Sequence, residues 1–230
     1  AERTFRLDVV AVDGRNEGPA PGRPAIVACR HAGPGDSMLL VDGLVNDHRR
    51  RPRIVLKDLL QLDPCFDVML NRVPTVFVPS SGPERDQVEA AIARLASDLG
   101  PEDALVIFPE GTNATASRKR RIIHRFRRAG RHDLATKADA LAHTLPPRTS
   151  GLFAAIDAAP HADVVFMVHT GLEHLNSLGD VWRGLPMDSR VLLGWWRVDA
   201  ADVPGDHADR ERWLYDEWQR LDDWVAQRQG

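Results

Sequence analysis

The chain has 230 residues, 43% of them hydrophobic and 27% charged, which is typical of one globular domain or at most two small ones. Its 30 basic and 33 acidic residues give a net charge of −3, which argues against a nucleic-acid-binding protein. Two cysteines, Cys29 and Cys65, are too few for a disulfide scaffold or a four-cysteine zinc site. No run of about 18 apolar residues could span a bilayer. Composition alone therefore predicts a soluble, intracellular α/β-type domain.

Strand and helix patterns alternate along the chain, as is typical of a sheet with helices packed on its faces. Short β-branched and apolar runs predict strands over residues 3–12, 25–29, 54–56, 75–78, 104–108, 164–168 and 190–198. Helices are expected to begin at residue 36 or 37, to cover residues 57–69, 83–99 and 207–227, and to include a basic helix after residue 112. A loop is expected around residues 146–148. We expect a single domain over residues 1–230, with a mixed, mostly parallel central sheet and helices on both faces.

His31 and Asp36 form an HxxxxD pair where the strand over residues 25–29 ends and the next helix begins. This position suits catalysis because strand ends of α/β sheets open onto the ligand crevice. An imidazole there can take a proton from a hydroxyl, while a carboxylate fixes its tautomer and stabilises the imidazolium. Taken alone, the pair is equally compatible with a turn histidine beside an ordinary helix cap.

A second motif, FPEGT at residues 108–112, ends the most apolar strand. Pro109 removes a backbone donor, and Gly111 lets the backbone approach a ligand closely. We expect Thr112 or Asn113 to cap the following helix, whose N-terminus would attract an anion. A simple strand-to-helix turn would also explain this string, but two motifs in this order on one chain favour a common site.

With these two motifs the sequence resembles the glycerolipid acyltransferases, the superfamily of 1-acylglycerol-3-phosphate (lysophosphatidic acid) acyltransferases. The likeness extends over roughly residues 25 to 225. Residues 54–64 resemble the stretch that follows the first motif in that family. Residues 145–151 resemble the LxPRTxGF segment of its lysocardiolipin-type branch, and Arg197, Pro204 and Trp213-Leu214 resemble the C-terminal part of that branch.

The resemblance implies an acyltransferase in which HxxxxD supplies the catalytic base and FPEGT binds the acceptor. His31 would deprotonate the free hydroxyl of a lysophospholipid, and Asp36 would orient His31 and balance its charge. The hydroxyl oxygen would then attack the thioester of acyl-CoA or acyl carrier protein, with backbone N–H groups stabilising the oxyanion. Glu110, Gly111 and Thr112 would position the acceptor. The acyl thioester enters as co-substrate, and no metal or other cofactor is implied.

Two departures from the family pattern concern the acceptor. The family's GxxFxxR motif matches residues 74–80, but Pro74 replaces its glycine, and Ser80 stands where an arginine would bind the acceptor's phosphate. Residues 113–114 likewise replace the arginine and serine that usually follow FPEGT. Serine does not reproduce the bidentate fork of arginine. Either the acceptor lacks a simple phosphomonoester, or another cation binds it, such as Lys57, Arg72 or Arg85. We expect an acceptor site that includes Lys57, Arg72 and Ser80.

Eight Lys and Arg residues lie between Arg118 and Arg131, with no acidic residue among them. A solvated helix face is the ordinary explanation of such a run. Nucleic-acid binding is disfavoured because no aromatic platform accompanies the charges. The position just after the acceptor motif favours contact with anionic lipid headgroups or CoA phosphates, to which each cation contributes about 1 kcal/mol near an anionic bilayer. The residues expected to make such contacts are Arg118, Lys119, Arg120, Arg121 and Arg148.

Two further patterns have structural explanations. The apolar positions of the last helix are Leu214, Trp218, Leu221 and Val225. Their spacing favours core packing, although the tryptophans nearby would also suit a membrane interface. His169, Glu173 and His174 supply at most a partial set of metal ligands, so we interpret them as a turn at a strand end.

The expected partners are acyl-CoA, a lysophospholipid acceptor and an anionic membrane surface, and nucleic acid is not among them. We expect a peripheral protein on the cytoplasmic face of the membrane. The start at Ala1, without an initiator methionine, leaves room for an upstream membrane anchor of the kind that family members often carry. Two alternatives remain open. One is a different acceptor, such as a glycolipid or a lysophospholipid with a larger headgroup, and the other is a catalytically inactive relic that binds lipid or acyl-CoA.

Overall fold

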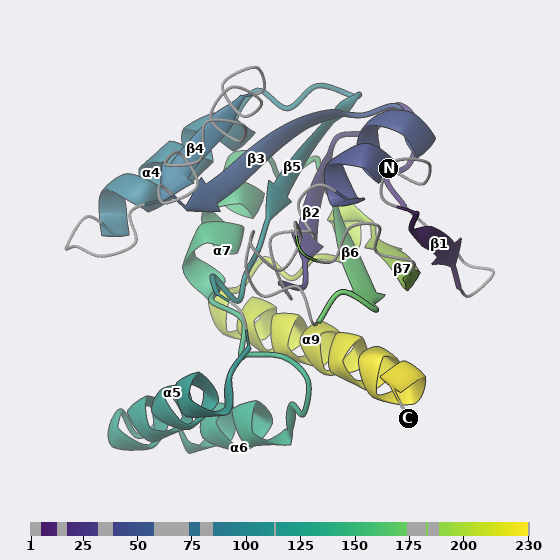
Figure 1. Ribbon diagram of the computed structural model, residues 1–230. Coiled ribbons are helices and arrows are strands. Elements are labelled where there is room, and N and C mark those ends of the chain that lie inside the picture. The colour runs from purple at the N-terminus through teal and green to yellow at the C-terminus, as the bar shows by residue number, and fades with distance from the viewer. Residues whose placement is uncertain are drawn as a thin grey trace.

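The computed structural model describes residues 6–12, 18–31, 39–57, 74–78, 85–112, 114–173, 183 and 189–229. Within these residues, seven strands form one sheet: β1 (Asp8–Ala11), β2 (Ala25–Cys29), β3 (Arg51–Lys57), β4 (Thr75–Val78), β5 (Asp103–Ile107), β6 (Asp163–Thr170) and β7 (Arg190–Val198). Their order is β1-β7-β6-β2-β5-β3-β4 (Figure 1). The pairing of β6 with β7 is antiparallel and every other pairing is parallel, so the expected mixed, mostly parallel sheet is confirmed.

The longer helices of the described residues are α4 (Arg85–Ala96), α5 (Ala116–Arg128), α6 (His132–Ala140), α7 (Thr149–Ala158) and α9 (His207–Gln229), with a short π-helical segment at Gly43–Asp47 and a 3₁₀ turn of helix at Ala200–Asp202. Helices α4, α7 and α9 cover one face of the sheet, where their apolar side chains pack with Ile26, Leu105 and Val164. A helical segment over residues 39–47 covers the other face through Leu39, Leu40 and Leu44. Helices therefore lie on both faces, as the sequence predicts.

The central strands β2, β5 and β6 are buried along their whole lengths. This explains their near-continuous apolar sequences, because a strand covered on both faces has no solvent side to alternate with. Helix α9 supplies four fully buried side chains, Leu214, Trp218, Leu221 and Val225. The interpretation of these positions as core is thus confirmed.

Helices α5 and α6 pack on each other through a small cluster of their own, formed by Ile123, Phe126, Ala135 and Ala138. Figure 1 shows this pair apart from the sheet, on the side of α9. Two ion pairs join it to α9: Arg131 with Glu211, and Lys137 with Asp216 at 2.5 Å. Helix α5 begins at Ala116, four residues after the last residue of the FPEGT segment, so its charges begin close to the second motif.

One expectation about the elements is wrong, and two helices, α6 and α7, are not expected from the sequence. Lys57 is the last residue of β3 rather than the first of a helix, and β3 begins at Arg51 because its arginines pair with acidic partners such as Asp103. Helix α6 was not predicted as a separate element. Helix α7 follows the expected loop at once, although its sequence is rich in small residues that weaken a helical pattern. One of them, Gly151, allows close packing, since a Cβ there would lie 3.1 Å from Ile92 and 3.3 Å from Ile107.

Candidate active site

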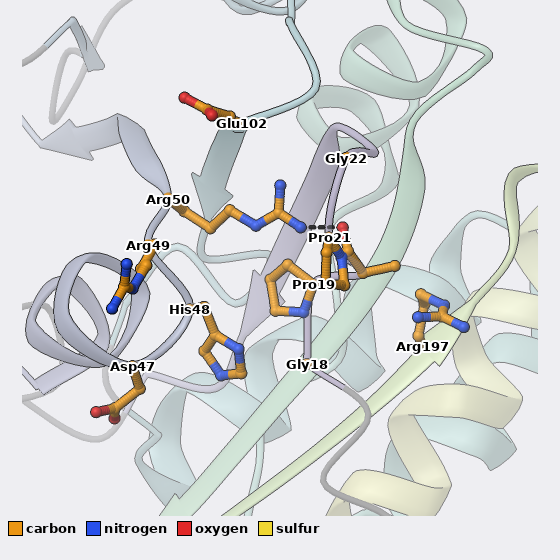
Figure 2. A pocket seen from close by; sticks show the side chains of 11 residues that line it. Gly18, Pro19, Pro21, Gly22, Asp47, His48, Arg49, Arg50, Glu102 and Arg197 are labelled. Atoms are coloured by element: carbon orange, nitrogen blue, oxygen red, sulfur yellow. Dashed lines mark hydrogen bonds between the residues drawn. The ribbon is translucent and has the colours of Figure 1, made fainter.

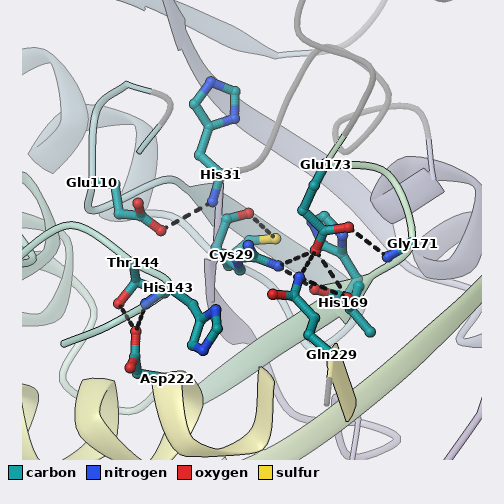
Figure 3. Close-up of polar contacts among 12 residues, drawn as sticks. Cys29, His31, Glu110, His143, Thr144, His169, Gly171, Glu173, Asp222 and Gln229 are labelled. Atoms are coloured by element: carbon teal, nitrogen blue, oxygen red, sulfur yellow. Dashed lines mark hydrogen bonds and ion pairs between the residues drawn. The ribbon is translucent and has the colours of Figure 1, made fainter. Parts of the chain in front are cut away.

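The two sequence motifs meet at the carboxyl end of the sheet. His31 lies two residues beyond β2, and Glu110 lies three residues beyond β5. The strands are parallel neighbours with Ala28 opposite Ile107, so their carboxyl ends share one edge. There the main-chain N–H of His31 donates to Oε1 of Glu110 at 3.2 Å (Figure 3). Residues separated by 79 positions in the sequence are thus in direct contact.

The carboxylate of Glu110 is only 2% exposed and accepts hydrogen bonds with both of its oxygens. Oε1 accepts from His31, and Oε2 accepts from the main-chain N–H of Leu145 at 3.0 Å. A buried carboxylate is tolerated when such donors stabilise its charge. Glu110 therefore links the FPEGT segment to the main chains of His31 and Leu145. Its expected contact with the acceptor stays a prediction, and the role seen here, which the motif alone did not suggest, is to hold the backbone of His31.

The side chain of His31 is half-buried beside an aromatic ring. Its imidazole lies 5.2 Å from the ring of Phe108, at a tilt of 53°. Phe108 is the first residue of FPEGT, so the second motif contacts both the main chain and the ring of His31. The predicted partner Asp36 lies outside the described residues, as do Arg72 and Ser80. The main chain of Lys57 is described at the end of β3, but its side chain is not.

Gly111 has a positive φ of 66°, which favours glycine, and it lies against a guanidinium group. A Cβ at this position would lie 3.3 Å from Cζ of Arg148 and 3.4 Å from its Nε. The main chain of Arg148 is fixed as well, because its N–H donates to the carbonyl of Pro109 at 2.9 Å. Arg148 was expected to contact phosphate or lipid headgroups, and the structure brings it to FPEGT. Thr112 lies beside Gly111 and is half-buried.

The loop before α7 is anchored by Asp222 of α9, which sequence reasoning missed. Asp222 is 2% exposed and accepts from the N–H groups of Ala142 and His143 at 2.7 and 2.8 Å, and from Oγ1 of Thr144 at 2.8 Å. The next residue, Leu145, donates to Glu110. An acidic residue within the apolar stripe of the last helix, beside Leu221, was the available signal.

On the other side of His31, Arg30 is buried and its guanidinium contacts Glu173 (Figure 3 shows Glu173 beside Gly171 and Gln229). Glu173 follows β6 in a turn, as expected, whereas His169 is a fully buried residue of β6 itself and His174 lies outside the described residues. Among the described residues, no three potential ligands gather as a metal site would require. Sequence reasoning also missed Arg30. The available signal was its position between the apolar strand and His31, because a buried cation needs an acidic partner.

The basic run forms α5, but its members differ in environment. Arg118, Arg120 and Arg121 are exposed, whereas the ammonium of Lys119 donates to the carbonyls of Asp139, at 2.8 Å, and Leu141. Lys119 thus binds the end of α6. The expected cap at Thr112 or Asn113 is wrong: the helix begins later, at Ala116, and Oγ1 of Thr115 accepts from the N–H of Arg118 at 3.3 Å.

A hollow of about 610 Å³ lies at the opposite, amino-terminal edge of the central strands (Figure 2). It is lined by residues 18–22, 47–50, Glu102 and Arg197, none of which belongs to the two motifs. Of the three arginines that line it, Arg50 donates hydrogen bonds to the main-chain carbonyls of Ala20, Arg23 and Pro101. We therefore place the candidate active site at the carboxyl edge.

Of the helices in the described ranges, none combines the length and apolar character needed to cross a membrane.

Comparisons with known proteins find a matching family and a similar fold. A family model described as Acyltransferase matches residues 9–166, a range that includes most of β1, all of β2 to β5, both motifs and half of β6. Among solved structures, the 1-acyl-sn-glycerophosphate (LPA) acyltransferase PlsC from Thermotoga maritima is similar in fold, with a TM-score of 0.59 and 16% sequence identity. The similarity covers 96% of this chain and 73% of the other. No curated protein matches the chain in sequence.

Proposed function

This chain belongs to the acyltransferase family, and on that premise we propose that it transfers a fatty acyl group from acyl-CoA, or acyl carrier protein, to the free hydroxyl of a lysophospholipid. The observation that carries the proposal is the hydrogen bond between the His31 main chain and Glu110, which unites the HxxxxD and FPEGT motifs at one edge of the sheet. Ligands of open α/β sheets bind at this edge.

In the proposed reaction, the His31 imidazole takes the proton of the acceptor hydroxyl as its oxygen attacks the thioester carbonyl. The tetrahedral oxyanion then collapses, the C–S bond breaks, and the ester remains on the acceptor. His31 returns the proton to the leaving thiolate. Asp36 would fix the tautomer of His31 and stabilise its charged form. The thioester supplies the activated acyl group, so we propose no metal or redox cofactor.

We propose that the acceptor lies over Gly111 and Thr112, with Arg148 contacting an anionic group of its head. A guanidinium offers paired donors that match phosphate oxygens. The contact between Arg148 and Gly111 supports this placement, since it brings a cation to the acceptor motif. Lys57, Arg72 and Ser80 complete the proposed acceptor site. The first candidate acceptor is 1-acylglycerol-3-phosphate, and PlsC, whose fold is similar, is described as an acyltransferase for this compound.

We further propose that α5 rests on an anionic membrane surface at the cytoplasmic face, as a peripheral contact. The exposed guanidinium groups of Arg118, Arg120 and Arg121 support this, because they follow the FPEGT segment and would hold the site near its bilayer-resident substrate. The same groups could instead receive the phosphates of CoA, and vesicle binding distinguishes the two.

The test is an acceptor panel with one long-chain acyl-CoA, read by mass spectrometry. The panel holds 1-acylglycerol-3-phosphate, lysophospholipids with larger headgroups and a glycolipid. We expect an acylated lysophospholipid, with 1-acylglycerol-3-phosphate used best. Acylation of the glycolipid alone would move the reaction to the alternative acceptor. Binding of acyl-CoA without any acylated product would identify a catalytically inactive relic and contradict the proposal.

A further inference from the structure

We propose that the ion pair between Arg30 and Glu173, closed by Gln229 of α9, is a positioning unit for His31. This inference rests on the proposed function, because it assigns the pair a role in placing the catalytic base. None of these three residues belongs to the two motifs. Glu173 and Gln229 also lie beyond the residues that the family model matches.

Arg30 precedes His31 and makes three hydrogen bonds, two to β6 and one to the turn that follows it. Its main-chain N–H donates to the carbonyl of Met167 at 3.2 Å, which extends the pairing of β2 with β6 past Cys29. Its Nη1 donates to the carbonyl of His169 at 2.7 Å and to Oε1 of Glu173 at 2.8 Å. The side chain is about 5% exposed, so its positive charge is stabilised by these partners rather than by water.

Glu173 is held by donors from three elements. Besides Arg30, its carboxylate accepts from Oγ1 of Thr170 at 2.9 Å, from the N–H of Gly171 at 2.8 Å and from Nε2 of Gln229 at 2.7 Å. Burial alone would raise the pKa of Glu173, but the hydrogen bond and charge of Arg30 and the Gly171 N–H outweigh it and lower the pKa to about 2. The carboxylate is therefore ionised throughout any practical assay range.

The turn that presents the Gly171 N–H requires glycine. Gly171 has a φ of 109°, and a Cβ there would lie 2.3 Å from the carbonyl oxygen of Arg190. The position of Glu173 is thus set by backbone geometry as well as by its partners.

His31 lies between this unit and Glu110. In the sheet, β2 lies between β6 and β5. The Arg30 side chain ties the end of β2 to the β6 side, while Glu110 ties the His31 N–H to the β5 side. With both sides fixed, the His31 backbone has little freedom to shift. Since a misplacement of about 1 Å can cost roughly 100-fold in rate, the pair is expected to act on kcat.

The test compares Glu173→Gln with a matched ion pair elsewhere. Asp157 pairs with the buried Arg210 at 2.5 Å, between α7 and α9, and neither residue belongs to the two motifs. At a temperature where circular dichroism shows each protein folded, we expect Glu173→Gln to lower kcat roughly tenfold or more, with KM for both substrates within about threefold. We expect Asp157→Asn to lower the melting temperature without changing kcat.

A second variant and a spectroscopic readout keep the inference testable. Gln229→Ala leaves the Arg30–Glu173 contact in place, so we expect a smaller fall in kcat. In ¹H–¹³C NMR spectra, the His31 ring signal, assigned with His31→Ala, should move in Glu173→Gln and stay in Asp157→Asn. Wild-type kcat in the folded Glu173→Gln protein, or in Gln229→Ala if Glu173→Gln does not fold, would overturn the inference. An unmoved His31 signal would do the same.

The two proposals fail separately. If the wild-type protein acylates no acceptor of the panel, the proposed function fails, and the His31 signal still decides whether the pair positions this residue. If the wild-type protein is active and Glu173→Gln retains its kcat, the positioning inference alone fails.

Discussion

The residues at the carboxyl edge include a buried side chain that constrains the backbone and a cation that is exposed to solvent. Glu110 is buried and accepts hydrogen bonds from two N–H groups, whereas Arg148, beside Gly111, is exposed. The acidic residue of FPEGT thus holds the main chains of His31 and Leu145, whereas its glycine leaves space for the guanidinium of Arg148.

Replacement of Gly111 tests this room. Gly111→Ala places a methyl group at positive φ, which costs about 1–2 kcal/mol, and against the guanidinium of Arg148. Gly130→Ala, with a φ of 71° and no atom within 4 Å of a new Cβ, carries the backbone cost alone. We expect similar losses of stability by thermal melting, and a raised KM for a lysophospholipid bearing a phosphomonoester in Gly111→Ala only. Equal KM values in the two variants would contradict the placement of Arg148.

Among single residues, the sequence predicts those that belong to a recognisable motif. His31 and Glu110 are predicted as site residues because they stand in motifs at strand ends. The contact between them depends on β2 and β5 being neighbours, which the alternating pattern does not specify. Arg30, Glu173, Asp222 and Gln229 belong to neither motif, and the sequence alone does not indicate which residues they contact. The contacts that join them to other elements span 56 to 143 residues, so only the folded chain brings these residues together.

Among the elements, α9 supports the site from both sides. Asp222 holds the loop whose next residue, Leu145, donates to Glu110, and Gln229 contacts Glu173. The terminal helix thus packs the core with its apolar stripe and fixes the site with two polar residues.

Asp222→Ala would leave two main-chain N–H groups and a hydroxyl without their acceptor. Since an unsatisfied buried group costs about 1–3 kcal/mol, we expect a loss of about 3 kcal/mol in the free energy of unfolding, together with a fall in kcat. Asp223→Ala changes an exposed neighbour, which accepts from the Gln219 side chain, and should stay within about 0.5 kcal/mol. Urea unfolding measures both, and a loss no larger in Asp222→Ala than in Asp223→Ala would refute the anchoring role.

Helix α5 offers a direct test of membrane contact. Replacing Arg120 and Arg121 together by Ala removes two exposed charges, each contributing about 1 kcal/mol near an anionic surface, so vesicle affinity should fall roughly 30-fold. Lys119→Ala is the matched control, because its ammonium already binds carbonyls of the α6 end. Sedimentation with phosphatidylserine-containing vesicles, against phosphatidylcholine alone, measures the effect. Equal affinity of the double variant and the wild type would argue for a merely solvated helix face.

The sequence predicts closely the bounds of elements with strong apolar patterns. It does not predict elements that depend on ion pairs or packing with distant residues. The bounds of β2, β4 and β7 agree with the sequence pattern. The extended start of β3 depends on ion pairs of Arg51 and Arg53 with Asp103, which no local pattern reveals. Helix α7 depends on close packing at Gly151 against α4 and β5, which overrides its weak local preference.

In the whole molecule, ion pairs stabilise both edges of the sheet. At the amino edge, burial would raise the pKa of Asp103, but the Gly100 N–H and the Arg53 guanidinium outweigh it and lower the pKa. At the carboxyl edge, the pKa of Glu173 falls from 4.5 to about 2. Carboxylates with a lowered folded pKa stabilise the protein above their unfolded pKa, and this contribution is lost as the pH falls.

We therefore expect the free energy of unfolding to decrease as the pH falls from about 4.5 toward 2 through Glu173. With solvent screening at this partly exposed side chain, its share is about 1–2 kcal/mol. Glu173→Gln lacks this titration, so its stability deficit relative to the wild type should shrink between pH 6 and pH 3. Urea unfolding at several pH values provides the measurement. A deficit that stays constant over this range would show that the carboxylate is not ion-paired in solution.

The central claim is that His31 is the base for acyl transfer at the carboxyl edge of this sheet. The most direct measurement is the rate of acylation of the best acceptor by His31→Ala, with circular dichroism to confirm its fold and His143→Ala as a matched histidine control. General-base catalysis contributes about 10²–10⁴-fold, so we predict a rate at least about 100-fold lower in His31→Ala and an unchanged rate in His143→Ala. A folded His31→Ala protein that acylates at the wild-type rate would contradict the account.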